Sequence, residues 1–271
     1  MHPMLHPQSY GGLFDRLRTP ARCLRMIVLL AALSLIWSGS QAAAPDYSEF
    51  DTVLLRNVRQ GFVDYAGINA DPAFARFLTS LDDTRPAELD GGTARRAFMI
   101  NAYNAFAIRG ILDGYTPSSW LARYTYLKRR QYALMGQPVS LQELETRQLL
   151  PEADPRIHFA IVCASISCPR LSSRAYVPEK LEEQLDLAAR TFINDSTRNR
   201  YDVQQKIAFV SKIFDWYGEE FIKPAGSVQK YMSTYVSDPA TAALLATDGF
   251  ELRFIPWDWE LNGTWQRQTG R

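Results

Sequence analysis

Beyond residue 42, the chain contains one histidine, His158, and two cysteines, Cys163 and Cys168. All three lie within residues 157–169, which read IHFAIVCASISCP. Imidazole and thiol groups are the usual agents of base catalysis, nucleophilic attack and soft-metal binding near neutral pH. Any chemistry of these kinds in this protein is therefore expected in this segment.

The two cysteines have four open interpretations. An even cysteine count in an exported chain favours a disulfide between Cys163 and Cys168, and four intervening residues can bring their Cα atoms into range. The others are a thiol nucleophile paired with His158, a zinc site and thiol–disulfide exchange. If residues 157–163 form a strand, His158 and Cys163 face opposite sides about 16 Å apart, so only Cys168 could approach the imidazole. We expect the disulfide, with no metal and no cofactor.

A catalytic role for His158 requires polar partners. Asn101 and Asn104 lie three residues apart in an apolar stretch that predicts a helix, so they share one face, where unpaired amides are costly. They form either a structural hydrogen-bond network or the polar wall of a pocket. Asp258, between tryptophans, could accept a proton from the imidazole and orient it. Glu145 is a weaker pocket candidate, because it could equally be a surface charge.

The elements that position these residues predict a helix-rich α+β domain. Helix-start signals, either an Asp followed by Pro or a capping box, occur at Asp71, Ser140 and Asp238. Alternating or apolar runs predict strands at 123–134, 157–163 and 250–257, with a hairpin at 201–210. Helices outnumber strands and do not alternate with them regularly. We therefore expect one domain of helices packed on a small, mainly antiparallel sheet.

The first 42 residues have the pattern of a secretory signal. Arginines precede an apolar run at 26–37 that is short for a membrane span, and small residues follow it. We expect cleavage near Ala42, a globular domain at 43–264, a polar tail at 265–271 and a periplasmic or secreted protein. The alternative is an uncleaved N-terminal anchor.

The charge balance of the remaining chain argues against nucleic-acid binding. Residues 43–271 carry 26 basic and 28 acidic side chains, whereas nucleic-acid-binding domains normally show a basic excess. No other segment is long and apolar enough to predict a membrane span. We expect the partner to be an unknown small molecule or an envelope component.

Four blocks of the sequence carry a family resemblance. Residues 98–105 read FMINAYNA, 157–169 IHFAIVCASISCP, 211–217 SKIFDWY and 257–262 WDWELN. In this order they resemble the WINAYNA, IHFALVC…SCP, LSxIFxWY and YDWxLN blocks of Domain of Unknown Function 547, an uncharacterised family of exported bacterial domains. Met99 and Trp257 stand where the family usually has Trp and Tyr.

The resemblance implies no agreed activity, but it adds Tyr103 and Trp216 to the pocket candidates. The order of a helix, a His-bearing strand and an acidic or amide residue is also similar to papain and transglutaminase folds, although Asn101 stands on the helix that carries their nucleophilic cysteine. We expect an envelope binding or structural module with a His/Asn/Asp pocket. The alternative is a hydrolase or transferase with His158 as general base, oriented by Asp258, and with Asn101 or Asn104 as an amide donor. Its nucleophile would be water or reduced Cys168.

Overall fold

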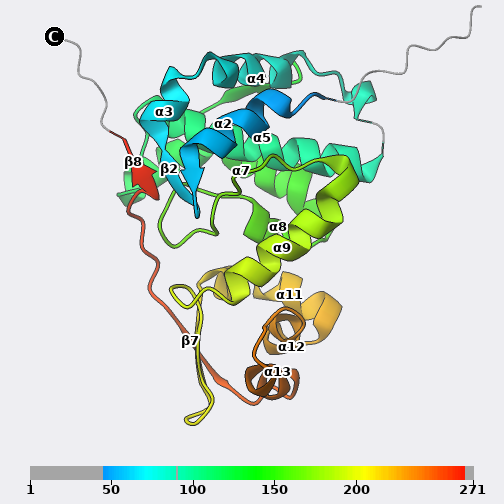
Figure 1. Cartoon of the computed structure of the whole chain (residues 1–271), viewed down its shortest axis with the longest axis vertical. Coiled ribbons are helices and arrows are strands. Elements are labelled where there is room, and N and C mark those ends of the chain that lie inside the picture. The colour runs from blue at the N-terminus through cyan, green and yellow to red at the C-terminus, as the bar shows by residue number, and fades with distance from the viewer. Residues whose placement is uncertain (1–44, 90, 266–271) are drawn as a thin grey trace, which may run out of the picture. The chain divides into compact units, whose positions relative to one another are not determined.

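The computed structural model describes residues 45–89 and 91–265 (Figure 1). The expected leader with its cleavage site, and nearly all of the expected polar tail, lie outside these residues.

Helices account for most of the regular structure in this part of the chain. The α-helices are α2 (Ser48–Asn57), α3 (Tyr65–Ala70), α4 (Pro72–Asp83), α5 (Gly92–Leu112), α6 (Trp120–Tyr124), α7 (Leu141–Glu143), α8 (Ile157–Ala160), α9 (Leu181–Ile193), α10 (Ile213–Trp216), α11 (Gly218–Ala225), α12 (Val228–Ser233) and α13 (Pro239–Ala246). The π-helical turns η2 (Thr125–Arg129) and η3 (Leu144–Leu149) directly follow α6 and α7. Short 3₁₀ turns occupy Pro86–Glu88, Leu150–Glu152 and Pro178–Lys180. Across the described ranges, we find no helix with both the length and the apolar character needed to span a bilayer.

The strands within residues 45–89 and 91–265 form three small sheets. The strands are β1 (Val58–Arg59), β2 (Phe62–Asp64), β3 (Tyr132–Leu134), β4 (Gln137–Val139), β5 (Arg200–Asp202), β6 (Ile207–Val210), β7 (Glu251–Phe254) and β8 (Gly263–Thr264). The sheet orders are β1-β2-β8, β3-β4 and β5-β6-β7, in which β2 with β8 and β6 with β7 are parallel and the other pairs antiparallel. The α+β class is confirmed, and the one expected sheet is divided into three.

The helix α5 lies at the centre of the larger of two hydrophobic cores. Every residue from Ala97 to Ile108 is buried, as expected for a helix that is covered on all sides. The second core is built from α9 to α13 and β6. Figure 1 shows α9 running between the region of α5 and α8 and the group α11, α12 and α13.

The expected strand at 157–163 is wrong, because its first four residues form the one-turn helix α8. Just before this turn, Asp154 accepts a hydrogen bond from the N–H of Arg156 at 3.0 Å, and the C=O of Pro155 accepts one from the N–H of His158 at 3.2 Å. An Asp-Pro pair, the signal that correctly predicted α4 and α13, thus also precedes α8, although its cap residue Arg156 makes no side-chain bond. An apolar run buried on all sides does not distinguish a short helix from a strand.

The expected strand at 123–134 is also wrong over most of its length. Ser119 caps α6 by accepting a hydrogen bond from the N–H of Ala122 at 3.2 Å, and η2 follows directly. Only Tyr132–Leu134 is a strand. Tyr126 lies against α5, where its hydroxyl donates to the C=O of Ala107 at 2.9 Å. This tertiary contact outweighs the strand preference of a Tyr-rich segment.

Candidate functional site

The helix α8 lies where the two cores meet, and this fixes His158. Ile157 and Ala160 belong to the first core, whereas Phe159 belongs to the second. The ring of Phe159 stacks on Phe192 with 5.0 Å between centroids. With its neighbours packed into both cores, His158 is the residue of this turn that lines the pocket beside the two cysteines.

This pocket has a volume of about 100 Å³ and is walled mainly by aromatic rings. The rings come from five residues: Tyr103, Trp216, Tyr217, Trp257 and Trp259. The π-helical turns η2 and η3 contribute Leu127 and Glu145 to the lining, and such turns are frequent at functional sites. Among the described residues that line the pocket, Glu145 is the one carboxylate and there is no Lys or Arg.

The imidazole of His158 has a carboxylate partner that the sequence did not reveal. Its Nε2 lies 2.9 Å from Oε2 of Glu220, and its ring packs on Tyr217 with centroids 3.9 Å apart. A side chain only 2 % exposed needs such a partner. When Nε2 donates its proton to Glu220, Nδ1 keeps a lone pair, which is the tautomer that a general base requires.

Tyr217, on which the imidazole packs, also contacts a second carboxylate, that of Glu145. The hydroxyl of Tyr217 donates to Oε1 of Glu145 at 2.6 Å. Burial raises the pKa of Glu145, and the hydrogen bond from Tyr217 offsets only part of this rise. Burial, together with the nearby carboxylate, also raises the pKa of Tyr217. Glu145 therefore holds its proton to higher pH than an ordinary glutamate.

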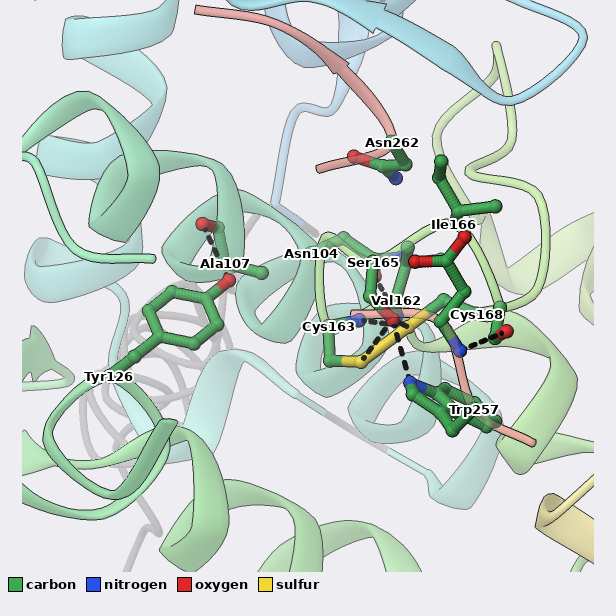
Figure 2. The surroundings of a disulfide bond; sticks show 12 residues. Asn104, Ala107, Tyr126, Val162, Cys163, Ser165, Ile166, Cys168, Trp257 and Asn262 are labelled. Atoms are coloured by element: carbon green, nitrogen blue, oxygen red, sulfur yellow. Dashed lines mark hydrogen bonds between the residues drawn. A yellow bond between two sulfur atoms is a disulfide. The ribbon is translucent and has the colours of Figure 1, made fainter. Parts of the chain in front are cut away.

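Cys163 and Cys168 form a disulfide with their Cα atoms 6.3 Å apart, which is within the usual range. Figure 2 shows Ser165 beside this bond: its hydroxyl accepts from Nε1 of Trp257 at 3.0 Å and lies 3.2 Å from Sγ of Cys168. Both cysteines line the pocket together with His158. The strand that the expected separation assumed is absent at His158, because residues 157–160 form a helical turn, which advances about 1.5 Å per residue instead of about 3.3 Å.

The segment 257–262 runs beside the cysteine loop and is joined to it by backbone hydrogen bonds. Trp257 and Trp259 line the pocket. The alternation of an extended chain leaves Asp258 exposed between them, where its Oδ1 accepts from the N–H of Glu260 at 2.9 Å. The prediction that Asp258 orients His158 is therefore wrong, because the carboxylate that contacts the imidazole belongs to Glu220.

The side chains of the two asparagines of α5 form hydrogen bonds with backbone groups instead of lining the pocket. Asn104 donates to the C=O of Ala160 at 3.0 Å and accepts from the N–H of Val162 at 2.9 Å. Asn101 makes the same pair of bonds to Tyr176, at 2.7 and 2.9 Å. Of the two interpretations of these asparagines, a structural hydrogen-bond network or the polar wall of a pocket, the structure has the hydrogen-bond network. Asn104 thereby fixes the exit of α8 and can influence the site only by positioning.

The remaining predicted residues, Tyr103, Glu145 and Trp216, all line the pocket. Glu220 and Tyr217 are site residues that the sequence did not predict. Glu220 lies in the first turn of α11, where acidic residues are common because they favour the helix dipole, so it carried no distinctive signal. Tyr217 ends the SKIFDWY block and could have been found there.

Within residues 45–89 and 91–265, no three His, Cys, Asp or Glu side chains lie close enough together to bind a metal ion.

A family model described as "Protein of unknown function, DUF547" matches residues 86–193. Neither a curated protein nor a solved structure matches the chain. The likeness to the papain and transglutaminase order depended on a His-bearing strand, whereas His158 lies on a helix.

Proposed function

Because the chain belongs to the DUF547 family, which is described only as of unknown function, we infer its role from the pocket: it binds a small, positively charged organic group beside His158. One observation carries this inference. Five aromatic residues and the carboxyl group of Glu145 face one cavity, and no Lys or Arg is found among the described residues of its lining.

The chemistry of the walls favours a cation. Tyr and Trp rings attract a positive charge over their faces, by about 0.5–1 kcal/mol at exposed sites and about 2 kcal/mol when the charge is desolvated. A volume of about 100 Å³ is smaller than the roughly 150 Å³ of an engineered cavity that binds benzene. The pocket is therefore suited to an ammonium or trimethylammonium head, with the remainder of the ligand outside.

Glu145 makes this binding dependent on pH. Its pKa is raised by burial, and a cation in the pocket would favour the ionised carboxylate and lower that pKa again. Ligand binding should therefore release a proton, and the affinity should rise as the pH passes through the pKa of Glu145. In an exported protein, as the leader predicts, the natural ligand would be a component of the envelope.

Choline and its neutral isostere 3,3-dimethylbutan-1-ol provide a matched pair of probes. We expect choline to change the tryptophan fluorescence of the protein at concentrations at least tenfold lower than the alcohol does. Glu145→Gln should weaken choline binding about tenfold, equivalent to about 1.4 kcal/mol, and leave the alcohol unaffected. The control is Glu219→Gln, which makes the same charge change at an exposed position. Equal binding of both probes would contradict recognition of charge, and binding of neither would reject the proposal.

A second candidate is a hydrolase or transferase, favoured by the presence of His158, held by Glu220, and both cysteines at one pocket. While the disulfide is intact, the nucleophile would be a water activated by His158. Reduction would provide the thiol of Cys168. The rate of iodoacetamide alkylation of the reduced protein, measured against pH, separates the cases. A thiol pKa well below the usual 8.5 that rises in His158→Gln supports the thiol mechanism, and ordinary thiol behaviour in both proteins removes it.

A further inference from the structure

The surface formed by α6 and η2 exposes large apolar side chains that do not belong to the lining of the pocket. Trp120 is 73 % exposed, Leu121 65 % and Tyr124 41 %. Scattered single apolar residues at a surface are ordinary, whereas neighbouring ones indicate an interaction site.

These side chains form a stripe that continues into a cationic group. The rings of Trp120 and Tyr124 stack with 6.1 Å between centroids, and Nζ of Lys128 lies 5.8 Å from the centre of the Tyr124 ring. Lys128 and Arg129 are both exposed. Among the described residues we find no ion pair of either side chain, whereas Arg130 next to them pairs with Asp113 at 2.7 Å.

The exposure belongs to an ordered part of the fold. Tyr126, in the same turn, is fully buried and bonded to α5 through the C=O of Ala107. The hydroxyl of Thr125 donates to the C=O of Leu121 at 3.0 Å, and Arg123 donates to the C=O of Pro117 at 3.2 Å. The aromatic stripe therefore projects from a fixed support instead of a frayed loop.

We propose that Trp120, Leu121, Tyr124, Lys128 and Arg129 form a docking surface for a bilayer that contains anionic phospholipids. Trp and Tyr concentrate at membrane–water interfaces, where an apolar ring with a polar edge fits best. Segments that bind in this plane combine such rings with Lys and Arg. Each cationic side chain near an anionic surface increases membrane affinity about fivefold. The uncompensated charge of the patch is the feature that selects a lipid surface over an apolar protein partner.

Docking here would bring the pocket close to the membrane. The guanidinium of Arg123 lies over the ring of Trp259, 4.3 Å from its centre, and Leu127 lines the pocket. The segment that carries the docking surface thus also forms one rim of the cavity. The membrane proposal does not depend on the choice of ligand, and it can fail or succeed separately.

Co-sedimentation of the full protein with phosphatidylcholine vesicles, with and without 30 mol % phosphatidylglycerol, tests the proposal. We expect binding to the anionic vesicles, weakened by salt, and at least tenfold less binding to the neutral ones. Trp120→Ser with Leu121→Ser, and separately Lys128→Ser with Arg129→Ser, should each lower the partition coefficient at least tenfold. All proteins share one N-terminus, so differences between them report on the patch.

The matched control is Leu187→Ser with Lys223→Ser, which removes an apolar and a cationic side chain that are also exposed. It should bind as the parent does. Near-ultraviolet circular dichroism checks the fold, and the charge pair provides the decision if the apolar pair does not fold. Equal loss in the control, or undiminished binding in both patch variants, would overturn the proposal. So would a dimer in solution that Trp120→Ser dissociates without any vesicle binding, because the surface would then serve a second copy of the chain.

Discussion

The side chain of Asn104 provides the sharpest test of how the site is held in place. Leucine has nearly the shape of asparagine, so Asn104→Leu keeps the packing of α5 but removes both of its hydrogen bonds. The C=O of Ala160 and the N–H of Val162 would then lack partners. Both residues are buried, so water cannot readily replace the amide.

The expected loss follows from the two unpaired groups. Leaving one buried backbone group unsatisfied costs about 1–3 kcal/mol, so two cost about 2–6 kcal/mol. Burying the leucine returns about 1.5–3 kcal/mol. At the middle of both ranges the free energy of unfolding should therefore fall by about 2 kcal/mol, a large part of the roughly 5–15 kcal/mol that stabilises a typical domain.

Urea unfolding measures the loss, and Asn101→Leu is the matched control because it removes an identical pair of bonds at Tyr176. Both variants should be destabilised to a similar extent. Only Asn104→Leu should shift the imidazole NMR signals of His158, because only this amide holds the exit of α8. A loss below about 0.5 kcal/mol in Asn104→Leu, or equal shifts of the His158 signals in both variants, would refute the positioning role.

Four further outcomes are expected. His158→Gln should lower the unfolding free energy by less than Asn104→Leu, measured in the same urea series; an unfolded His158→Gln protein would show the pocket assignment to be wrong. Because burial raises the folded-state pKa of Glu145 above its unfolded value, folding stability should fall as the pH rises from about 4.3 to that pKa, and urea curves of Glu145→Gln between pH 4 and 8 should lack this fall. Gly110→Ala should destabilise by about 1–3 kcal/mol in thermal melts, despite the better helix propensity of Ala, since the new Cβ would meet two tyrosine side chains at 2.5 and 2.6 Å. Cys163→Ser should cost about 2 kcal/mol in urea unfolding, the loop entropy of a short disulfide; a variant that is about 2 kcal/mol less stable than the reduced parent as well would show that the loss does not come from the bond.

Local signals predicted the helices well, because a helix start depends on a few neighbouring residues. Asp71 accepts from the N–H of Ala73 at 3.0 Å and starts α4. Ser140 forms the expected capping box with Glu143. In the same way, Ser227 and Asp238 cap α12 and α13. Each cap satisfies backbone N–H groups that the helix itself leaves unpaired.

Strand assignments failed where tertiary packing decided the conformation. Residues 157–160 are buried on all sides by two cores, so their hydrophobicity has no period that separates helix from strand. The amide of Asn104 then provides, from a helix, the hydrogen bonds that a neighbouring strand would otherwise supply to the residues after α8. A side chain in this role leaves no repeating pattern in the segment that it holds.

The sequence by itself determined which residues have reactive side chains, where most helices begin, the α+β class and the family blocks, because these depend on residue type and near neighbours. Only the tertiary structure decided the partners of those residues. It placed Glu220, 62 positions away in sequence, against His158, and the tryptophans of segment 257–262 beside the cysteine loop. Side-chain contacts across such distances depend on how two cores pack against each other, and no local spacing along the chain encodes them.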